Sequence, residues 1–252
     1  MVIFTIFVTM KKSIFIVGSV WMALSCCMPV RAQEQPELQA FQEAAGDRSI
    51  LFRGKQADRY TLLANGNPYW ENAEYKRGDI VFEDNAYYDV LVNIDAYRQR
   101  ALVRMSGSPM AVSLAPAQTP SITAGGRHFV GIGPGEALPE GFYEVFGSGP
   151  EHVYKHIEKR LNSSTSYVNG STIGYLDDNY RNDVTRYFAL LKSYYFQDAQ
   201  GNFSRFKGRS ALIRKFPDRK KKIRQALAGS RLDSSETSFD AFCEAVLNIA
   251  AQ

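Results

Sequence analysis

Residues 78–95 decide the fold of this chain, and they read GDIVFEDNAYYDVLVNID. Two apolar runs, Ile80 to Phe82 and Tyr87 to Asp95, flank a polar turn at Asp84 and Asn85. Aromatic and β-branched residues dominate both runs, and these residue types suit a half-buried pleated surface. Short apolar runs separated by turn residues are typical of antiparallel strands. The stretch therefore predicts two strands of a larger sheet or barrel.

The same pattern continues on both sides of this stretch. Apolar runs begin at Arg48 and recur up to Phe146, at a spacing of about 8–12 residues. Residues 106–126 are rich in small and polar residues and predict a long surface loop around a short strand. Two later runs flank the turn Asp198 to Gly201 and predict a hairpin. We assign residues 48–208 to an antiparallel β body, because no recurring helix separates the runs as a parallel α/β fold requires.

The sequence around Val153 fits two structures. Val153, Ile157 and Leu161 would lie on one face of a helix and equally on one face of a strand. On a helix, His152 and His156 could chelate a metal together, whereas on a strand they would lie about 13 Å apart. No third His or Cys lies nearby, so we expect two exposed polar residues and no metal site.

Residues 209–252 change to a helical pattern with a strongly basic start. Pro217 precedes a segment that places Ile223, Ala226 and Leu227 on one face before Gly229 closes it. A second helix is expected to begin near Ser235 or Ser238. Its buried stripe would consist of Phe239, Phe242, Val246 and Ile249. The predicted fold class is α+β: a mainly antiparallel β body, sheet or barrel-like, with two C-terminal helices packed on it.

The first residues predict a secretory signal peptide. Residues 1–32 contain three cations and no acid, and a mostly apolar run follows Lys11 and Lys12. A basic start, a short apolar region and small residues before the cut define such a peptide. We place cleavage after Ala32, which leaves residues 33–47 as a polar arm.

The N-terminal residues also leave two alternatives open. The apolar stretch within residues 1–28 could be a membrane anchor. Cys26 or Cys27 could be the acylation site of a lipoprotein, although neither has both the preceding leucine and the small residue that acylation prefers.

Removal of residues 1–32 changes the charge and the cysteine count. Three cations leave with the segment, so the formal net charge falls from +4 to +1. Cys243 is then the only cysteine, and no internal disulfide can form. Its apolar neighbours Phe242 and Val246 predict a buried small hydrophobe rather than a reactive thiol.

No catalytic motif stands out in the sequence. A Gly-x-Ser-x-Gly elbow is absent. Residues 131–135 resemble a phosphate-binding loop only in glycine content, because neither a Lys-Ser/Thr pair nor a clear helix follows. We therefore assign no catalytic residue, no metal and no cofactor.

Aromatic and acidic side chains gather between residues 69 and 95. The acids are Glu71, Glu74, Asp79, Glu83, Asp84, Asp89 and Asp95. Paired carboxylates could serve a glycosidase, and aromatic residues beside acids also form carbohydrate-binding surfaces. Both residue types are equally common on any exposed β face. Tyr69 and Trp70 are candidate binding residues, and a secreted glycosidase-like hydrolase using residues 71–95 is the alternative function.

The strongest anomaly in composition is a basic segment, residues 205–224. Ten cations against the single acid Asp218 give this segment a charge of +9, so the rest of the mature chain carries −8. Such a run can bind anionic lipid headgroups or another polyanion, or it can be a solvated helix face. We expect no nucleic acid as the target of an exported protein. The candidate binding residues in the segment are Lys220, Lys221, Lys222 and Arg224.

Two groups of stretches resemble uncharacterised exported envelope proteins of the Bacteroidetes type. The first comprises residues 76–90 and 93–97, and the second comprises residues 193–196, 203–207 and 212–223. The resemblance implies export and a β-rich body with a basic helical end. It brings no known activity and no catalytic residue.

The sequence thus predicts a non-enzymatic exported protein of the periplasm or outer membrane that acts by binding or interaction. The reason is that nucleophile, base and metal ligands do not come together in any recognisable constellation. The expected partner is anionic lipid or a polyanion at residues 205–224, or another envelope protein.

Overall fold

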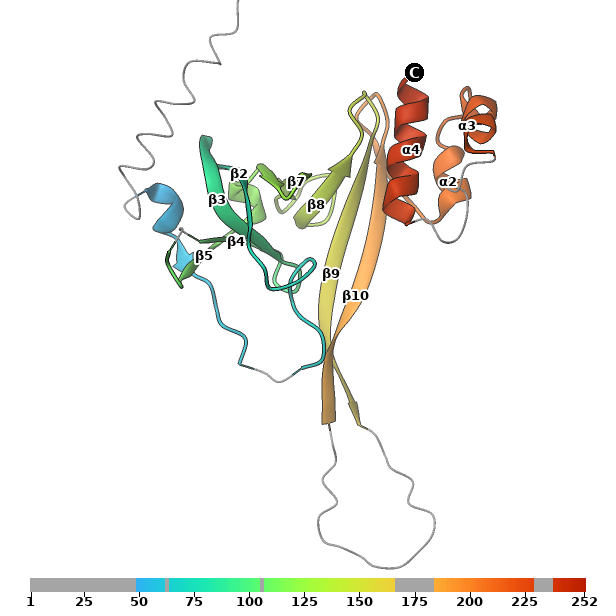
Figure 1. The fold of residues 1–252 in the computed structure, drawn as a ribbon. Helices are drawn as coiled ribbons and strands as arrows, with labels where there is room; N and C mark the ends of the chain where they lie inside the picture. Colours follow the sequence, from blue (N-terminus) through green and yellow to red (C-terminus); the bar gives the residue numbers. More distant parts are fainter. Residues whose placement is uncertain (1–48, 62–63, 105–106, 166–183, 229–237) are drawn as a thin grey trace, which may run out of the picture. The chain divides into compact units, whose positions relative to one another are not determined.

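The computed structural model describes residues 49–61, 64–104, 107–165, 184–228 and 238–252 (Figure 1). All of them belong to one compact unit, Ala45–Gln252. The predicted signal peptide 1–32, with its cleavage site at Ala32 and the alternative acylation sites Cys26 and Cys27, lies outside the described residues. The polar arm 33–47 does so too.

The described strands form one open, eleven-stranded antiparallel sheet, as the α+β prediction requires. The strand order is β1-β5-β4-β3-β2-β6-β7-β8-β9-β10-β11, so most neighbours in the sheet are also neighbours in the chain. The bounds are β1 Lys55–Gln56, β2 Lys76–Phe82, β3 Asn85–Asp95, β4 Arg100–Arg104, β5 Ala111–Leu114, β6 Ser121–Ala124, β7 Arg127–Ile132, β8 Gly141–Phe146, β9 His152–Thr165, β10 Val184–Gln197 and β11 Phe203–Phe206.

The hairpin of β2 and β3 contains residues 78–95. Glu83 and Asp84, at the turn, both have positive φ angles, of 47° and 63°, which is the backbone twist that two-residue hairpin turns require. A Cβ on Gly78 would lie 2.0 Å from the Thr123 carbonyl oxygen of β6, so only glycine allows this approach. Residues 78–95 therefore set both the turn and the contact with the next strand.

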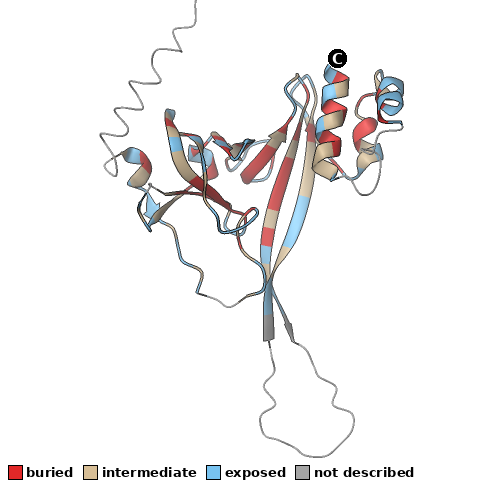
Figure 2. Cartoon of the chain, viewed as in Figure 1, coloured by how far each residue is buried: buried red, intermediate tan, exposed pale blue. Residues whose placement is uncertain are grey.

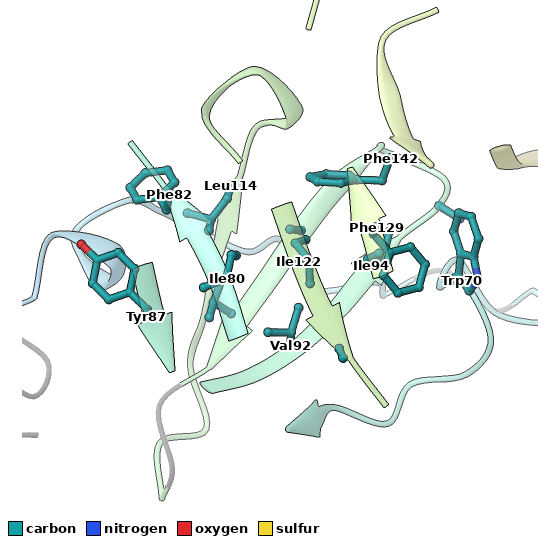
Figure 3. Close-up of a cluster of buried hydrophobic side chains, with 14 of the residues drawn as sticks. Trp70, Ile80, Phe82, Tyr87, Val92, Ile94, Leu114, Ile122, Phe129 and Phe142 are labelled. Carbon is teal, nitrogen blue, oxygen red and sulfur yellow. The ribbon is translucent and has the colours of Figure 1, made fainter. Parts of the chain in front are cut away.

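The sheet buries a first apolar core on one side. Figure 3 shows its central side chains, which come from strands far apart in the sequence. They include Ile80, Val92, Ile94, Ile122, Phe129 and Phe142. Ile80, Ile122 and Phe129 alternate with more exposed neighbours, as on a sheet with one buried face, whereas Ile94 and Phe142 lie in runs that are buried on both faces.

A second apolar core joins the C-terminal helices to the sheet. The helices are α2 Arg209–Ile213, α3 Lys220–Leu227 and α4 Phe239–Ala251. Their apolar faces pack with Phe146, Val153 and Phe196 from β8, β9 and β10. Figure 1 shows α4 beside the ends of β9 and β10, with α2 and α3 next to it. Ser238 caps α4, because its side chain accepts a hydrogen bond from the Ala241 backbone amide.

The structure confirms some local predictions and corrects others. The turn 198–201 joins β10 to β11 as predicted, and the ambiguous segment after Glu151 is strand β9. Residues 106–126 contain two strands and a 3-10 turn, η3 (Pro116–Gln118), rather than one strand in a loop. Both strands pair within the sheet, and this pairing outweighs the weak local preference of small and polar residues for loops. Ala226 of α3 is exposed, since only Ile223 and Leu227 of this helix are buried.

Lys155 of β9 is buried where the two cores meet. Only 3% of the residue is exposed. Its ammonium nitrogen lies 2.9 Å from Glu144 Oε2 on β8 and 2.6 Å from Asp240 Oδ2 in the first turn of α4. It also lies 5.7 Å from the centre of the Trp70 ring. A buried charge is tolerated only when it is paired in this way, so Lys155 ties the helices to the sheet.

Lys155→Met is expected to lower the free energy of unfolding by about 3–5 kcal/mol, because it leaves the buried Glu144 carboxylate without its nearest cation. Urea denaturation followed by circular dichroism measures this change. The matched control is Lys192→Met on the neighbouring strand β10, where the side chain is exposed; we expect a change of less than about 0.5 kcal/mol. Equal losses in the two variants would contradict the role of Lys155.

Candidate functional site

Tyr69 and Trp70 are adjacent in sequence but serve different parts of the structure. Their segment lies alongside the last residues of β3. Tyr69 forms an isolated antiparallel β-bridge with Asp95, and the Trp70 amide donates a hydrogen bond to the Ile94 carbonyl at 2.8 Å. Trp70 is buried and packs edge-to-face on Phe129, with ring centres 5.2 Å apart (Figure 3). Tyr69 is half-buried and faces Tyr60 instead. The structure therefore does not bring the two rings together as one binding surface.

Tyr69 belongs to an aromatic cluster formed by Tyr60, Tyr69, Tyr97 and Phe188. Tyr60 is central, with each of the other three ring centres between 6.1 and 6.2 Å away, in edge-to-face arrangements. Phe188 comes from β10, and the backbone of Asn65 joins that strand by hydrogen bonds to Arg186 and Phe188. The segment between β1 and β2 is thereby fixed against a strand more than a hundred residues away.

Asp95 is the buried acid beside the aromatic cluster. It accepts hydrogen bonds from the Tyr60 hydroxyl and from the amides of Tyr97 and Arg98, the last two at 3.0 and 2.9 Å. Burial and this hydrogen bond raise the pKa of the Tyr60 hydroxyl far above its usual value. Burial also raises the pKa of Tyr69, with a further contribution from the Asp95 charge. Both phenols are therefore hydrogen-bond donors at neutral pH.

The acids proposed for a hydrolase do not form a paired catalytic set in their described contacts. Glu71 lies 2.6 Å from both Lys76 and Arg127, and Asp89 pairs with Arg77. Asp95 accepts hydrogen bonds from Tyr60, Tyr97 and Arg98. The hydrogen bond from Lys76 is the largest effect on Glu71 and lowers the pKa of its carboxyl. A general acid needs a raised pKa, so Glu71 is unsuited to that role at neutral pH.

Glu71 and Glu74 do line a small cavity together with Trp70. Its volume is about 40 Å³, and a single water needs roughly 10–15 Å³ of such space. The cavity has room for a few waters and is far below the size of ordinary ligand pockets. Trp70 is one of the residues that line this cavity, and its Nε1 atom is buried without a hydrogen-bond partner in the described chain.

The histidines and the cysteine show no catalytic arrangement. His152 and His156 lie on strand β9, so the helical chelate does not form. The expectation that both are exposed is wrong: His156 is buried and stacks on Tyr143, with ring centres 4.7 Å apart, and His152 is half-buried. Burial lowers the pKa of His156. No group of three or more metal-ligating side chains occurs in the part of the chain that the structure describes.

The basic segment 205–224 divides into internal and outward cations. Arg205 donates to Ser193, Lys215 to Ser204, and Arg219 to Glu151 and the Ala250 carbonyl. Arg209 lies over the Phe242 ring. The contacts of these four cations attach the helical part to the sheet or join parts of the helical part to one another. Part of the basic segment therefore serves to hold the folded structure together.

The remaining cations of the segment have no ion pair with any described residue. They are Lys207, Arg214, Lys220, Lys221, Lys222 and Arg224. Lys221, Lys222 and Arg224 are exposed on α3, and we call these three residues the basic surface. Figure 2 shows that much of this helix is exposed. Lys220 is only half-exposed, because it begins the helix next to the packed Arg219. The predicted group of four therefore reduces to three fully outward cations.

Several contacts in these sites were missed by the sequence analysis. Tyr60 approaches Tyr69 only because Asn65 pairs with β10, which no local pattern reveals. Lys155 carried a usable signal: once Val153 and Ile157 are placed on the buried face of a strand, Lys155 between them must lie on the same face. The alternation of side chains along this strand therefore predicts that Lys155 is buried, but only after the segment has been assigned to a strand.

Comparison with family models, with curated proteins and with solved structures finds no match to this chain. The resemblance to exported envelope proteins of the Bacteroidetes type thus stays a prediction. Among the described residues, no helix combines the length and apolar character needed to cross a bilayer.

Cys243 is expected to resist alkylation in the folded protein. It is fully buried within the helical core, and burial raises the pKa of its thiol. Only the thiolate reacts at a useful rate. Mass spectrometry of the peptide containing Cys243, after iodoacetamide treatment at pH 8, should show labelling in guanidinium chloride and almost none in buffer. Rapid labelling of the native protein would contradict a structural thiol.

Proposed function

We propose that this chain is an exported, non-enzymatic protein of the periplasm or outer membrane, and that its basic surface attaches it to anionic lipid headgroups or another polyanion. The observation that carries the proposal is the outward position of Lys221, Lys222 and Arg224 without acidic partners among the described residues. Arg205, Lys215 and Arg219 of the same segment donate hydrogen bonds to other parts of the chain, whereas Lys221, Lys222 and Arg224 form no ion pair with a described residue.

The position of these cations on α3 favours attachment through the helix surface. Ile223 and Leu227 hold the opposite side of α3 in the helical core. The basic surface is thus presented on a rigidly packed helix. Each Lys or Arg close to an anionic membrane contributes about 1 kcal/mol to association. Three such residues give binding that is reversible and sensitive to salt.

The contacts of the acids give no specific support to the alternative hydrolase. Glu71 is neutralised by two cations, and the cavity beside it admits water rather than a sugar ring. Binding therefore accounts for the geometry better than hydrolysis does.

Replacing Lys221, Lys222 and Arg224 together by Gln should weaken association with vesicles by up to about 3 kcal/mol. The measurement is co-sedimentation of the mature protein with vesicles of phosphatidylglycerol and phosphatidylcholine, with pure phosphatidylcholine and soluble dextran sulfate as separate arms. Binding should also weaken between 0.1 and 1 M salt, where the Debye length shrinks from about 10 to about 3 Å.

The control for this experiment removes the same charge elsewhere. Arg53, Arg186 and Lys192 are exposed outside the basic segment, and their triple replacement by Gln should leave association nearly unchanged. Loss of binding in both triple variants would indicate net charge alone. Association that resists the α3 substitutions and 1 M salt would overturn the proposal.

Export is tested independently by the N-terminus of the native protein. We expect mass spectrometry after cell fractionation to find an envelope protein that begins at Gln33, because cleavage is predicted after Ala32. An acylated Cys26 or Cys27 would instead identify the lipoprotein alternative. A chain that keeps its first residues and occurs in the cytoplasm would contradict export.

A further inference from the structure

A groove of about 340 Å³ opens at the β1 end of the sheet. It is lined by the residues that follow β1, by the segment before β2 and by the start of β5. This volume lies at the lower end of the range of small-molecule sites, roughly 300–1,000 Å³. The groove is separate from the basic surface, since none of its lining residues comes from the C-terminal helices.

Three tyrosines, Tyr60, Tyr69 and Tyr75, line this groove. Tyr60 and Tyr69 are fixed by the aromatic cluster, and Tyr75 by the Arg104 guanidinium, which lies 4.5 Å from its ring centre. Neither the Tyr69 hydroxyl nor the Tyr75 hydroxyl forms a hydrogen bond to a described residue. Rings held in place with unused hydroxyls offer both an apolar face and polar contacts at little cost in conformational entropy.

The other lining residues are a mixture of polar and apolar groups without net charge. Asp58 and Arg59 contribute opposite charges, Gln56 contributes an amide, and Met110 is 58% exposed at the rim. Asp58 is partly neutralised further by Arg98, at 3.1 Å. A lining of this kind neither attracts an ion strongly nor excludes hydroxyl groups.

Two ligand classes fit this groove poorly. A cation would seek the tyrosine faces, but Arg98 and Arg104 already occupy a face of Tyr60 and of Tyr75 and would repel it. A purely apolar ligand would bury the Gln56 amide and the hydroxyls of Tyr69 and Tyr75 without hydrogen-bond partners, which costs free energy. The remaining class is neutral and carries both C–H faces and hydroxyl groups.

We propose that this tyrosine groove is a binding site for a neutral saccharide, with one sugar ring against Tyr69 and Tyr75 and hydroxyl groups bonded to Gln56 and Asp58. C–H groups of a pyranose match the negative face of an aromatic ring. Carboxylate and amide oxygens accept hydrogen bonds from the sugar hydroxyls. The site contains no catalytic arrangement for cleaving the sugar, so binding is its function. It does not depend on the basic surface.

The experiment measures binding of four neutral tetrasaccharides, cellotetraose, mannotetraose, xylotetraose and chitotetraose, to the full mature protein. Calorimetry gives the Kd, and NMR of ¹³C-labelled tyrosine rings locates the contact. Tyr75→Ala should weaken Kd by about tenfold or more, as expected for truncation of an aromatic anchor. Tyr187→Ala is the matched control, because this tyrosine is exposed on β10 outside the groove; it should change Kd by less than about twofold.

Two further variants keep the test valid if Tyr75→Ala fails to fold. Tyr75→Phe retains the ring and Gln56→Ala alters only an exposed side chain, so both leave the core intact. Gln56→Ala should weaken tetrasaccharide binding by removing the amide contact, and Tyr75→Phe should weaken it by removing the hydroxyl that the ring offers to the sugar. Binding that is unaffected by all groove variants would overturn the proposal. The proposal would also be overturned if the tyrosine resonances shifted on addition of tetramethylammonium or 1-hexanol but with none of the four tetrasaccharides. Tyrosine resonances that shift with no probe at all would overturn it as well.

Discussion

The pairing of the Lys155 ammonium with Glu144 and Asp240 is the interaction on which the rest of the structure depends. Lys155 lies on the same buried face of β9 as Val153 and Ile157, which belong to different cores. The charge therefore separates the core of the sheet from the core of the helices. Because a buried ammonium group must keep both carboxylates close, α4 is held in one position on β8 and β9.

This constraint extends through a chain of alternating charges. Glu144 also approaches Arg127 at 3.5 Å, Arg127 pairs with Glu71, and Glu71 pairs with Lys76. At the other end, Asp240 accepts a hydrogen bond from the Tyr194 hydroxyl at 2.8 Å. Glu71, which looks like a catalytic candidate in sequence, is thus a member of a network of paired side chains. Their charges are balanced, and this balance explains why Glu71 does not act as a free carboxylate beside its cavity.

The two proposed binding surfaces are formed by different kinds of structural element, a helix in one case and irregular segments in the other. The basic surface belongs to a short helix whose inner side is fixed by Ile223 and Leu227. The tyrosine groove belongs to irregular segments that the aromatic cluster and Asp95 hold against the sheet. In both cases buried contacts position the exposed groups, so a ligand would not have to order them at an entropic cost.

Local patterns determined the class of the fold. Alternating aromatic and β-branched residues in 78–95, with turn residues between the runs, specify antiparallel strands because side chains on a strand alternate between its faces. The stripe of Phe242 and Val246 specifies the last helix, and Ser238 its start, because capping and helical periodicity are local properties. The burial of Cys243 followed from the same stripe.

Only the tertiary structure decided which of the candidate residues lie together. It placed Trp70 in the core and Tyr69 in a groove, because neighbours on an extended chain point to opposite sides. It divided the cations of 205–224 into paired and outward ones, since the acid partner Glu151 lies just before β9 and the hydroxyl partners Ser193 and Ser204 lie on β10 and β11. The approach of Tyr60 to Tyr69 and Phe188 depends on long-range pairing at Asn65. Such contacts are set by sheet register and packing, and neither is encoded within a short window of sequence.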